Sequence, residues 1–172
     1  MITILRLGHR IFRDQRITTH CALAGRALGA DSMVYTGQRD RETEQSVRKV
    51  SAQWGGSFII RHSGSWKREM DGFRGVKVHL TVYGMPFQDM MAEIRKKSRN
   101  NVMIIVGGEK VPPEVYQEAD YNMSVTTQPH SEVASLALFL HEYHGGKELD
   151  RKFNKAKLKV IPQERGKKTV KK

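Results

Sequence analysis

Two short polar loops, each directly after a strand-like apolar run, contain the residues best suited to binding a small ligand. Residues 102–106 are followed by Gly-Gly-Glu-Lys-Val-Pro at 107–112, and residues 121–125 by Thr-Thr-Gln-Pro-His-Ser-Glu at 126–132. The second loop offers backbone donors and acceptors of the kind that read an adenine edge. If the two strands lie side by side, their ends form a crevice for a ligand. The expected chemistry is therefore recognition of a nucleoside-like molecule.

Both loops also have an ordinary structural interpretation. Gly107-Gly108 would serve as a tight connection after a strand, and Ser131 would cap the following helix with Glu132 in its first turn. The sequence has no G-x-G-x-x-G and no G-x-x-x-x-G-K-[ST]. The usual dinucleotide fingerprint and the P-loop are therefore excluded, and a nucleoside cofactor would need another architecture.

The chain is strongly basic, and the charge is uneven. It has 30 Lys+Arg against 18 Asp+Glu, a formal charge of +12. Residues 147–172 hold eleven basic and three acidic residues, a net +8. A disordered solubility tail is one interpretation of the last eight residues. For the whole chain we favour a nucleic-acid partner, because Lys and Arg gain free energy by releasing condensed counterions.

Length and composition narrow the class further. The 172 residues fit one domain, which we place at 1–146, followed by a basic extension at 147–172 whose last residues we expect to be disordered. No apolar run is long enough to cross a membrane, and the N-terminus has no signal-peptide pattern. One cysteine, Cys21, gives neither an internal disulfide nor a cysteine-based zinc site, so we expect no metal and a cytoplasmic protein.

Strands and helices alternate along the chain, which predicts an α/β fold with a mostly parallel sheet. Thr18 or Thr19 would cap the first helix, after an arginine-rich loop, and Asp40 would cap the second. Phe87, Met90 and Ile94 fall on one helix face. The expected strands are 2–7, 33–35, 58–61, 76–82, 102–106 and 121–125. The first expected helix ends at 27, and the others cover 40–54, 65–70, a segment around 87–94, 113–119 and 131–143.

Four segments together resemble a known family. Gly107–Pro112 and Thr126–Ala137 look like the cofactor loops of the SPOUT methyltransferases. Leu5-Arg-Leu-Gly-His-Arg10 with the arginines up to His20, and His79-Leu-Thr-Val-Tyr-Gly84, narrow the resemblance to the archaeal tRNA (cytidine-2′-O)-methyltransferases that act at T-loop position fifty-six. The four motifs in this order are specific, and the resemblance covers about residues 4 to 153.

The resemblance implies features that composition could not show. Family members have a deep C-terminal trefoil knot in the α/β fold, bind S-adenosyl-L-methionine in a bent form, act on tRNA and form homodimers whose active sites take residues from both chains. Knots are otherwise nearly absent from proteins. The cofactor site carried over from the family is Leu80, Gly107, Gly108, Glu109, Lys110, Val111, Val125, Thr126, Thr127, Gln128, Pro129, His130, Ser131 and Glu132.

The same resemblance points to Arg16 as the catalytic residue of the N-terminal motif. Because arginine loses its proton with great difficulty, we prefer a fixed cation that stabilises the developing alkoxide or grips a phosphate. His20 lies four residues on, and histidine is the usual proton acceptor near neutral pH, so it is a candidate base. The RNA-binding candidates are Arg6, His9, Arg10 and Arg13.

Two alternatives remain at this stage. Gly72-Phe-Arg-Gly75 matches the G-x-x-G loop with which KH domains clamp a nucleic-acid backbone, so the chain could be a non-catalytic RNA-binding module. A helix end followed by a turn explains the same residues. The other alternative keeps the fold but changes the target to another RNA or to a base.

Overall fold

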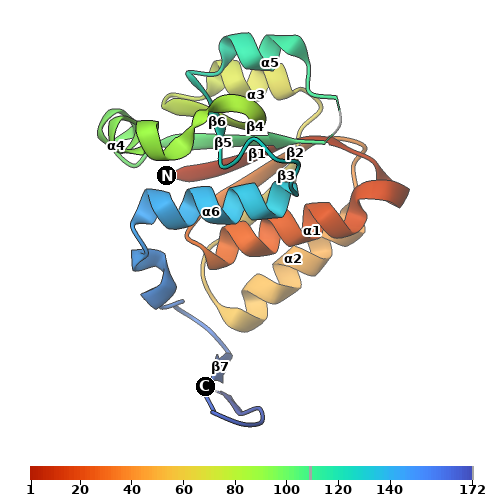
Figure 1. Ribbon diagram of the computed structural model, residues 1–172. Helices are drawn as coiled ribbons and strands as arrows, with labels where there is room; N and C mark the ends of the chain where they lie inside the picture. The colour runs from red at the N-terminus through yellow and green to blue at the C-terminus, as the bar shows by residue number, and fades with distance from the viewer. Residues whose placement is uncertain (109, 172) are drawn as a thin grey trace.

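The computed structural model describes residues 1–108 and 110–171 and is built around one six-stranded sheet (Figure 1). The strand order is β3-β2-β1-β5-β4-β6, and every neighbouring pair is parallel. This confirms the predicted α/β class with a mostly parallel sheet. The strands are β1 (Ile2–His9), β2 (Ser32–Gly37), β3 (Ile59–His62), β4 (Val76–Pro86), β5 (Val102–Gly107) and β6 (Tyr121–Ser124).

Helices cover both faces of the sheet. Figure 1 shows α1, α2 and α6 on one face and α3 and α5 on the other. Met91 and Ile94 of α4 belong to the same apolar cluster as Leu136 and Phe139 of α6, which places α4 on the α6 side. The helices are α1 (Ile11–Ala27), α2 (Arg41–Trp54), α3 (Trp66–Gly72), α4 (Phe87–Ser98), α5 (Pro113–Glu118) and α6 (Glu132–His144).

The two-sided cover explains the apolar runs of the central strands. Residues 102–106 of β5 are all buried, and so are residues 2–7 of β1. Strands buried on both faces lose the alternation of polar and apolar residues. Ile4 and Ile104 face the larger cluster with α1 and α6, whereas Leu5 and Ile105 face the smaller cluster under α3 and α5.

Helix α1 begins at Ile11, so the prediction that Thr18 or Thr19 caps it was wrong. The Asp14 carboxylate accepts hydrogen bonds from the backbone N–H (3.1 Å) and Nε (2.7 Å) of Arg10, the cap residue. The first of these bonds satisfies the Arg10 N–H at the start of the helix. The sequence pattern had placed this residue in a loop. The Thr19 hydroxyl donates to the Gln15 carbonyl within the helix at 2.9 Å.

Strand β4 is longer than predicted and bends sharply near its end. Leu80 and Met85 both pair with Met123 of β6, so residues 81–84 bulge out of the sheet. A Cβ atom at Gly84 would lie 2.4 Å from the backbone nitrogen of Met123, and therefore only glycine fits there. The bulge places 81–83 beside the ends of β5 and β6.

Beyond α6 the chain leaves the main body (Figure 1). A 3₁₀ turn, η1 (Lys147–Asp150), is followed by an antiparallel hairpin of β7 (Leu158–Val160) and β8 (Thr169–Lys171). The sequence had predicted weak helix and tail here. The division into a domain at 1–146 and an extension stays a prediction. Among the described residues, no helix is both long enough and apolar enough to pass through a lipid bilayer.

Candidate active site

The ends of β4 and β5, together with α5 and the start of α6, enclose a cavity at the carboxyl edge of the sheet. The crevice predicted from the sequence required β5 and β6 to be neighbouring strands, but β4 lies between them. The two loops therefore meet across the bulge of β4. The cavity is lined by His79, Leu80, Thr81, Val82, Tyr83, Val106, Gly107, Gly108, Val111, Tyr116, His130, Glu132 and Ser135.

Six of the predicted cofactor residues line this cavity: Leu80, Gly107, Gly108, Val111, His130 and Glu132. Residues 126–129 form an exposed loop before it, and the Ser131 hydroxyl caps α6 by accepting from the Ala134 N–H at 3.1 Å. Glu109 lies outside the described residues. Lys110, Val125, Thr126, Thr127, Gln128, Pro129 and Ser131 are not among the lining residues, so their predicted role stays untested.

Two features of the cavity suit a polar ligand. A Cβ atom at Gly108 would meet nothing closer than Glu132 Oε1, at 3.7 Å, so the missing side chain leaves open space for a ligand. His130 Nε2 is buried and has no hydrogen-bond partner among the described residues. A buried polar atom without a partner is costly unless a ligand or water satisfies it. The residues present therefore fit a ligand with both a compact body and hydrogen-bonding groups.

Sequence reasoning missed several lining residues on β4 and α5. The motif around His79 was recognised, but only Leu80 was taken from it. His79 Nδ1 lies 2.9 Å from Asn122 Oδ1, and its ring packs edge-on against Tyr116 at 4.6 Å. Burial lowers the pKa of His79 below its ordinary value. The neutral imidazole therefore holds β4, β6 and α5 together behind the cavity.

Arg6 is not on the surface, which corrects its place among the RNA-binding candidates. It is 1% exposed, and its guanidinium faces the Glu132 carboxylate with Nε–Oε2 at 2.9 Å and Nη2–Oε1 at 3.3 Å. This pair ties β1 to the first turn of α6. Nearby, burial raises the pKa of the Cys21 thiol to about 12, so that thiol stays protonated and unreactive.

His9 is also buried, so it too is not available to RNA. Its Nδ1 lies 2.7 Å from the Thr18 hydroxyl, and its Nε2 lies 3.4 Å from Asp40 Oδ2. Asp40 in turn caps α2, accepting from the N–H groups of Glu42 and Thr43. Burial lowers the pKa of His9, with the Arg6 charge as a smaller cause. His9 thus links the middle of α1 to the start of α2.

The remaining N-terminal candidates lie on the exposed side of α1. Arg10, Arg13, Arg16 and His20 are all exposed, and Arg10 is paired with Asp14. Arg16 and His20 are four residues apart and share one face of the helix. Neither lines the cavity of its own chain. The structure therefore brings six of the predicted cofactor residues into one cavity, and the two catalytic candidates lie outside it.

The G-x-x-G segment has the ordinary explanation. Helix α3 ends at Gly72, and β4 begins at Val76, so the four residues are a helix end and a turn. A KH loop joins two helices, and this one does not. The observation that favoured a KH module is thereby removed.

Comparison with solved structures defines the class of protein. The chain shares the fold of the SpoU methyltransferase AviRb from Streptomyces viridochromogenes, which was solved in complex with AdoMet. The TM-score is 0.59 at 16% identity, over 83% of this chain and 56% of that chain. The fold is therefore that of the SPOUT methyltransferases, with a candidate ligand site at the carboxyl ends of its strands.

Sequence comparison identifies the family. Residues 54–170 match the sequence model of the tRNA ribose 2′-O-methyltransferase family aTrm56. The tRNA (cytidine(56)-2′-O)-methyltransferase of Pyrococcus horikoshii is 49% identical over 172 residues, covering 99% of this chain and 85% of the relative. The enzyme of the same name from Pyrococcus abyssi is 51% identical, with coverage of 99% and 87%. The chain belongs to this family.

Proposed function

We propose that this protein methylates the ribose 2′-oxygen of cytidine 56 in the T-loop of tRNA, with S-adenosyl-L-methionine as the methyl donor. The observation that carries the proposal is the cavity at the ends of β4 and β5 and the start of α6, where the Gly108 position is open and His130 offers an unsatisfied nitrogen. Family membership supplies the reaction and the acceptor.

The cofactor would be held by the residues that line the cavity at the ends of β4 and β5 and at the start of α6. S-adenosyl-L-methionine supplies a sulfonium methyl group, and transfer forms the O–CH₃ bond, breaks the C–S bond and releases the hydroxyl proton. The cavity encloses about 180 Å³, whereas sites that hold a whole small ligand usually exceed roughly 300 Å³. The lining residues would therefore have to move apart when the cofactor binds.

The acceptor ribose would be presented by α1 of a second copy of the chain. Arg16 and His20 are exposed and do not line their own cavity. A homodimer that places one α1 opposite the partner's cavity would complete the site. Arg16 then stabilises charge on the 2′-oxygen, and His20 accepts its proton. Arg10 and Arg13, on the same exposed stretch, bind phosphates of the T-arm.

The direct test uses tRNA transcripts, labelled S-adenosyl-L-methionine and mass-spectrometric mapping of the product. A transcript with cytidine at position 56 should gain one methyl group on that ribose. A matched transcript with 2′-deoxycytidine at position 56 should gain none. Methylation of the deoxy transcript, or a label on a base or another nucleotide, would contradict the proposal and favour a different target for the same fold.

The net charge of +12 fits a tRNA substrate, and we place the enzyme in the cytoplasm with its substrate.

A further inference from the structure

A second cavity lies at the opposite edge of the sheet from the cofactor site. It is bounded by residues that precede β2 and β3, whereas the cofactor cavity follows the carboxyl ends of the strands. A six-residue strand spans roughly 20 Å, so the two cavities are separate. The second cavity encloses about 360 Å³ and is lined by Arg26, Ala30, Asp31, Gly56, Ser57, Phe58, Arg151, Lys152, Phe153, Asn154 and Lys155.

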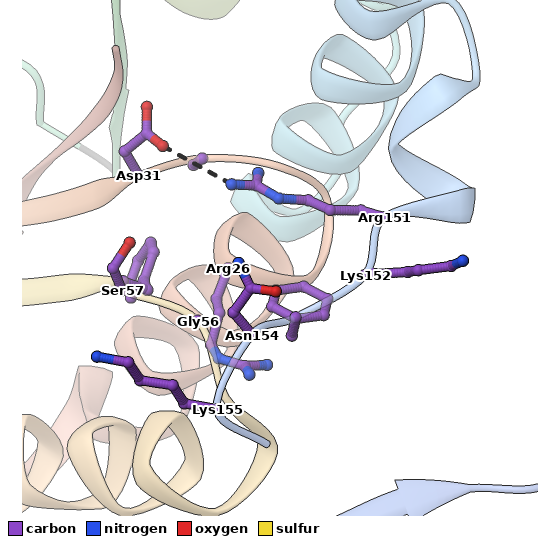
Figure 2. Close-up of a pocket in the computed structure, with 11 residues that line it drawn as sticks. Arg26, Asp31, Gly56, Ser57, Arg151, Lys152, Asn154 and Lys155 are labelled. Atoms are coloured by element: carbon purple, nitrogen blue, oxygen red, sulfur yellow. Dashed lines mark ion pairs between the residues drawn. The ribbon is translucent and has the colours of Figure 1, made fainter.

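The C-terminal segment forms one wall of this cavity by docking on the ends of α1 and α2 (Figure 2). The N–H of Gly56 donates to the Asn154 carbonyl at 2.9 Å, and the N–H of Lys157 donates to the Gln53 carbonyl at 3.0 Å. A Cβ atom at Gly55 would lie 2.5 Å from the Asn154 oxygen. The close backbone contact shows that the segment is fitted to this surface.

The lining is predominantly cationic. Four basic residues and one acidic residue, Asp31, are among the lining residues, and Arg151 approaches Asp31 at 3.8 Å. The guanidinium groups of Arg26 and Arg151 both lie near the ring of Phe153. The guanidinium carbons lie 4.6 Å (Arg26) and 5.8 Å (Arg151) from the centre of the ring. Two like charges are thus held at one aromatic ring.

Arg26 is the most informative of these residues, because it is only 7% exposed. Its Nη2 donates to the Gly55 carbonyl at 2.5 Å, but its Nε has no hydrogen-bond partner among residues 1–108 and 110–171. Burial and the Arg151 charge both lower the pKa of Arg26. The site therefore has buried positive charge that a bound anion would offset.

Lys155 lies in a turn of the docked segment, and its backbone φ is +59°. The hydrogen bonds of Asn154 with Gly56 and of Lys157 with Gln53 hold the backbone on either side of this residue. The docking of the segment therefore fixes Lys155 beside the cavity.

We propose that this cavity binds a backbone phosphate of the RNA substrate at a point remote from the methylated nucleotide. The proposal rests on the proposed function for the identity of the RNA. A polynucleotide is favoured over a free anion because the cavity adjoins the hairpin of β7 and β8, which belongs to a segment carrying a net +8. Several phosphates of one strand can then contact the cavity and the hairpin together.

The test compares two double variants of the full chain that change the charge equally. Arg151→Glu with Lys155→Glu alters the cavity, and Lys49→Glu with Lys96→Glu alters exposed positions on α2 and α4 outside it. The probes are a whole tRNA transcript and an isolated T-arm hairpin, and affinity is measured over a series of salt concentrations. Thermal melting checks folding, and Lys155→Glu alone is used if the double variant melts early.

We expect the cavity variant to bind whole tRNA at least about tenfold more weakly than the control variant, with a salt slope smaller by about one per lost phosphate contact. The loss for the T-arm hairpin should be no greater than that of the control. Equal losses in both variants, or equal losses for both RNAs, would overturn the proposal. The proposal would also be overturned if inorganic phosphate raised the melting temperature of the protein while the cavity variant bound tRNA as tightly as the control variant. Because binding is measured directly, failure of the methylation assay alone would not affect the result.

Discussion

At the scale of single residues, Gly107 and Gly108 have different reasons to be glycine. A Cβ atom at Gly107 would lie 2.7 Å from Val111 and 3.3 Å from Leu7, so the protein itself excludes a side chain there. At Gly108 the nearest atom is 3.7 Å away, so only a ligand would exclude one. From the sequence alone, the two glycines could not be assigned different roles. Only their surroundings in the fold distinguish them.

Gly108→Ala should therefore impair binding without impairing folding. We predict that S-adenosyl-L-methionine binds at least about tenfold more weakly, a loss of about 1.4 kcal/mol, because the methyl group occupies ligand space. The melting temperature should stay unchanged. Calorimetric titration and thermal melting measure the two effects. Gly64→Ala, whose added Cβ also meets nothing within 4 Å, is the matched control and should bind normally.

The buried Arg6–Glu132 pair is a residue-scale feature that sequence reasoning placed wrongly. Arginines in a basic N-terminal segment were assigned to the surface, but β1 is covered on both faces, so Arg6 is buried with its neighbours. Removing one member leaves a buried charge without its partner, which typically costs about 3–5 kcal/mol.

Arg6→Met should lower the free energy of unfolding by about that amount in urea denaturation, and adding Glu132→Leu should restore most of it. Arg61→Ala, which breaks the more exposed pair with Glu69, should cost only about 0–1 kcal/mol. Equal costs for Arg6→Met and Arg61→Ala would show that the buried pair has no special role.

At the scale of elements, local signals predicted some boundaries and missed others. Asp40 caps α2 and Gly145 ends α6 in the left-handed conformation, as their residue types indicate. The start of α1 and the bulge of β4 were missed. Both depend on partners that the local pattern does not reveal. The start of α1 depends on the Asp14 carboxylate, which accepts from Arg10. The bulge of β4 arises because Leu80 and Met85 both pair with Met123.

The contact of β4 with β6 should make stability depend on pH. Because burial lowers the pKa of His79 below 6.5, the unfolded chain takes up a proton more readily than the folded chain. The free energy of unfolding therefore falls as the pH drops below about 6.5. His9 and His144, whose pKa values are also lowered by burial, act in the same direction.

We predict a lower denaturation midpoint at pH 5.5 than at pH 7.5, and a smaller difference in His79→Gln. His20→Gln, at an exposed position, should keep the full difference. Denaturation curves of the three proteins at both pH values would measure this. An unchanged difference in His79→Gln would mean that other groups cause the acid sensitivity.

At the scale of the whole molecule, Arg16 does not line the candidate cavity of its own chain, so the proposed site needs a second copy of the chain. The parallel sheet, the basic charge and the two strand-end loops followed from the residues alone. The methyl donor, the tRNA target and the dimer came from the family resemblance, because composition and periodicity carry no information about them. The knot implied by the resemblance stays a prediction. General rules of chain connection would not have suggested a knot.

A shared site predicts that two inactive chains can restore each other. Arg16→Ala removes the cation but keeps the cavity, whereas Gly108→Trp fills the cavity but keeps the cation. Mixed after unfolding and refolding together, the two variants should recover about a quarter of the wild-type activity, since half of the dimers contain one complete site. Activity no greater than the sum of the separate variants would exclude a site shared between chains.

The most direct measurement is a crystal structure of the protein with S-adenosyl-L-methionine. We predict that the donor lies between Leu80, Gly108 and His130, with its methyl group facing Arg16 of the partner subunit. A donor bound in another cavity, or one whose methyl group faces away from any arginine of α1, would contradict it.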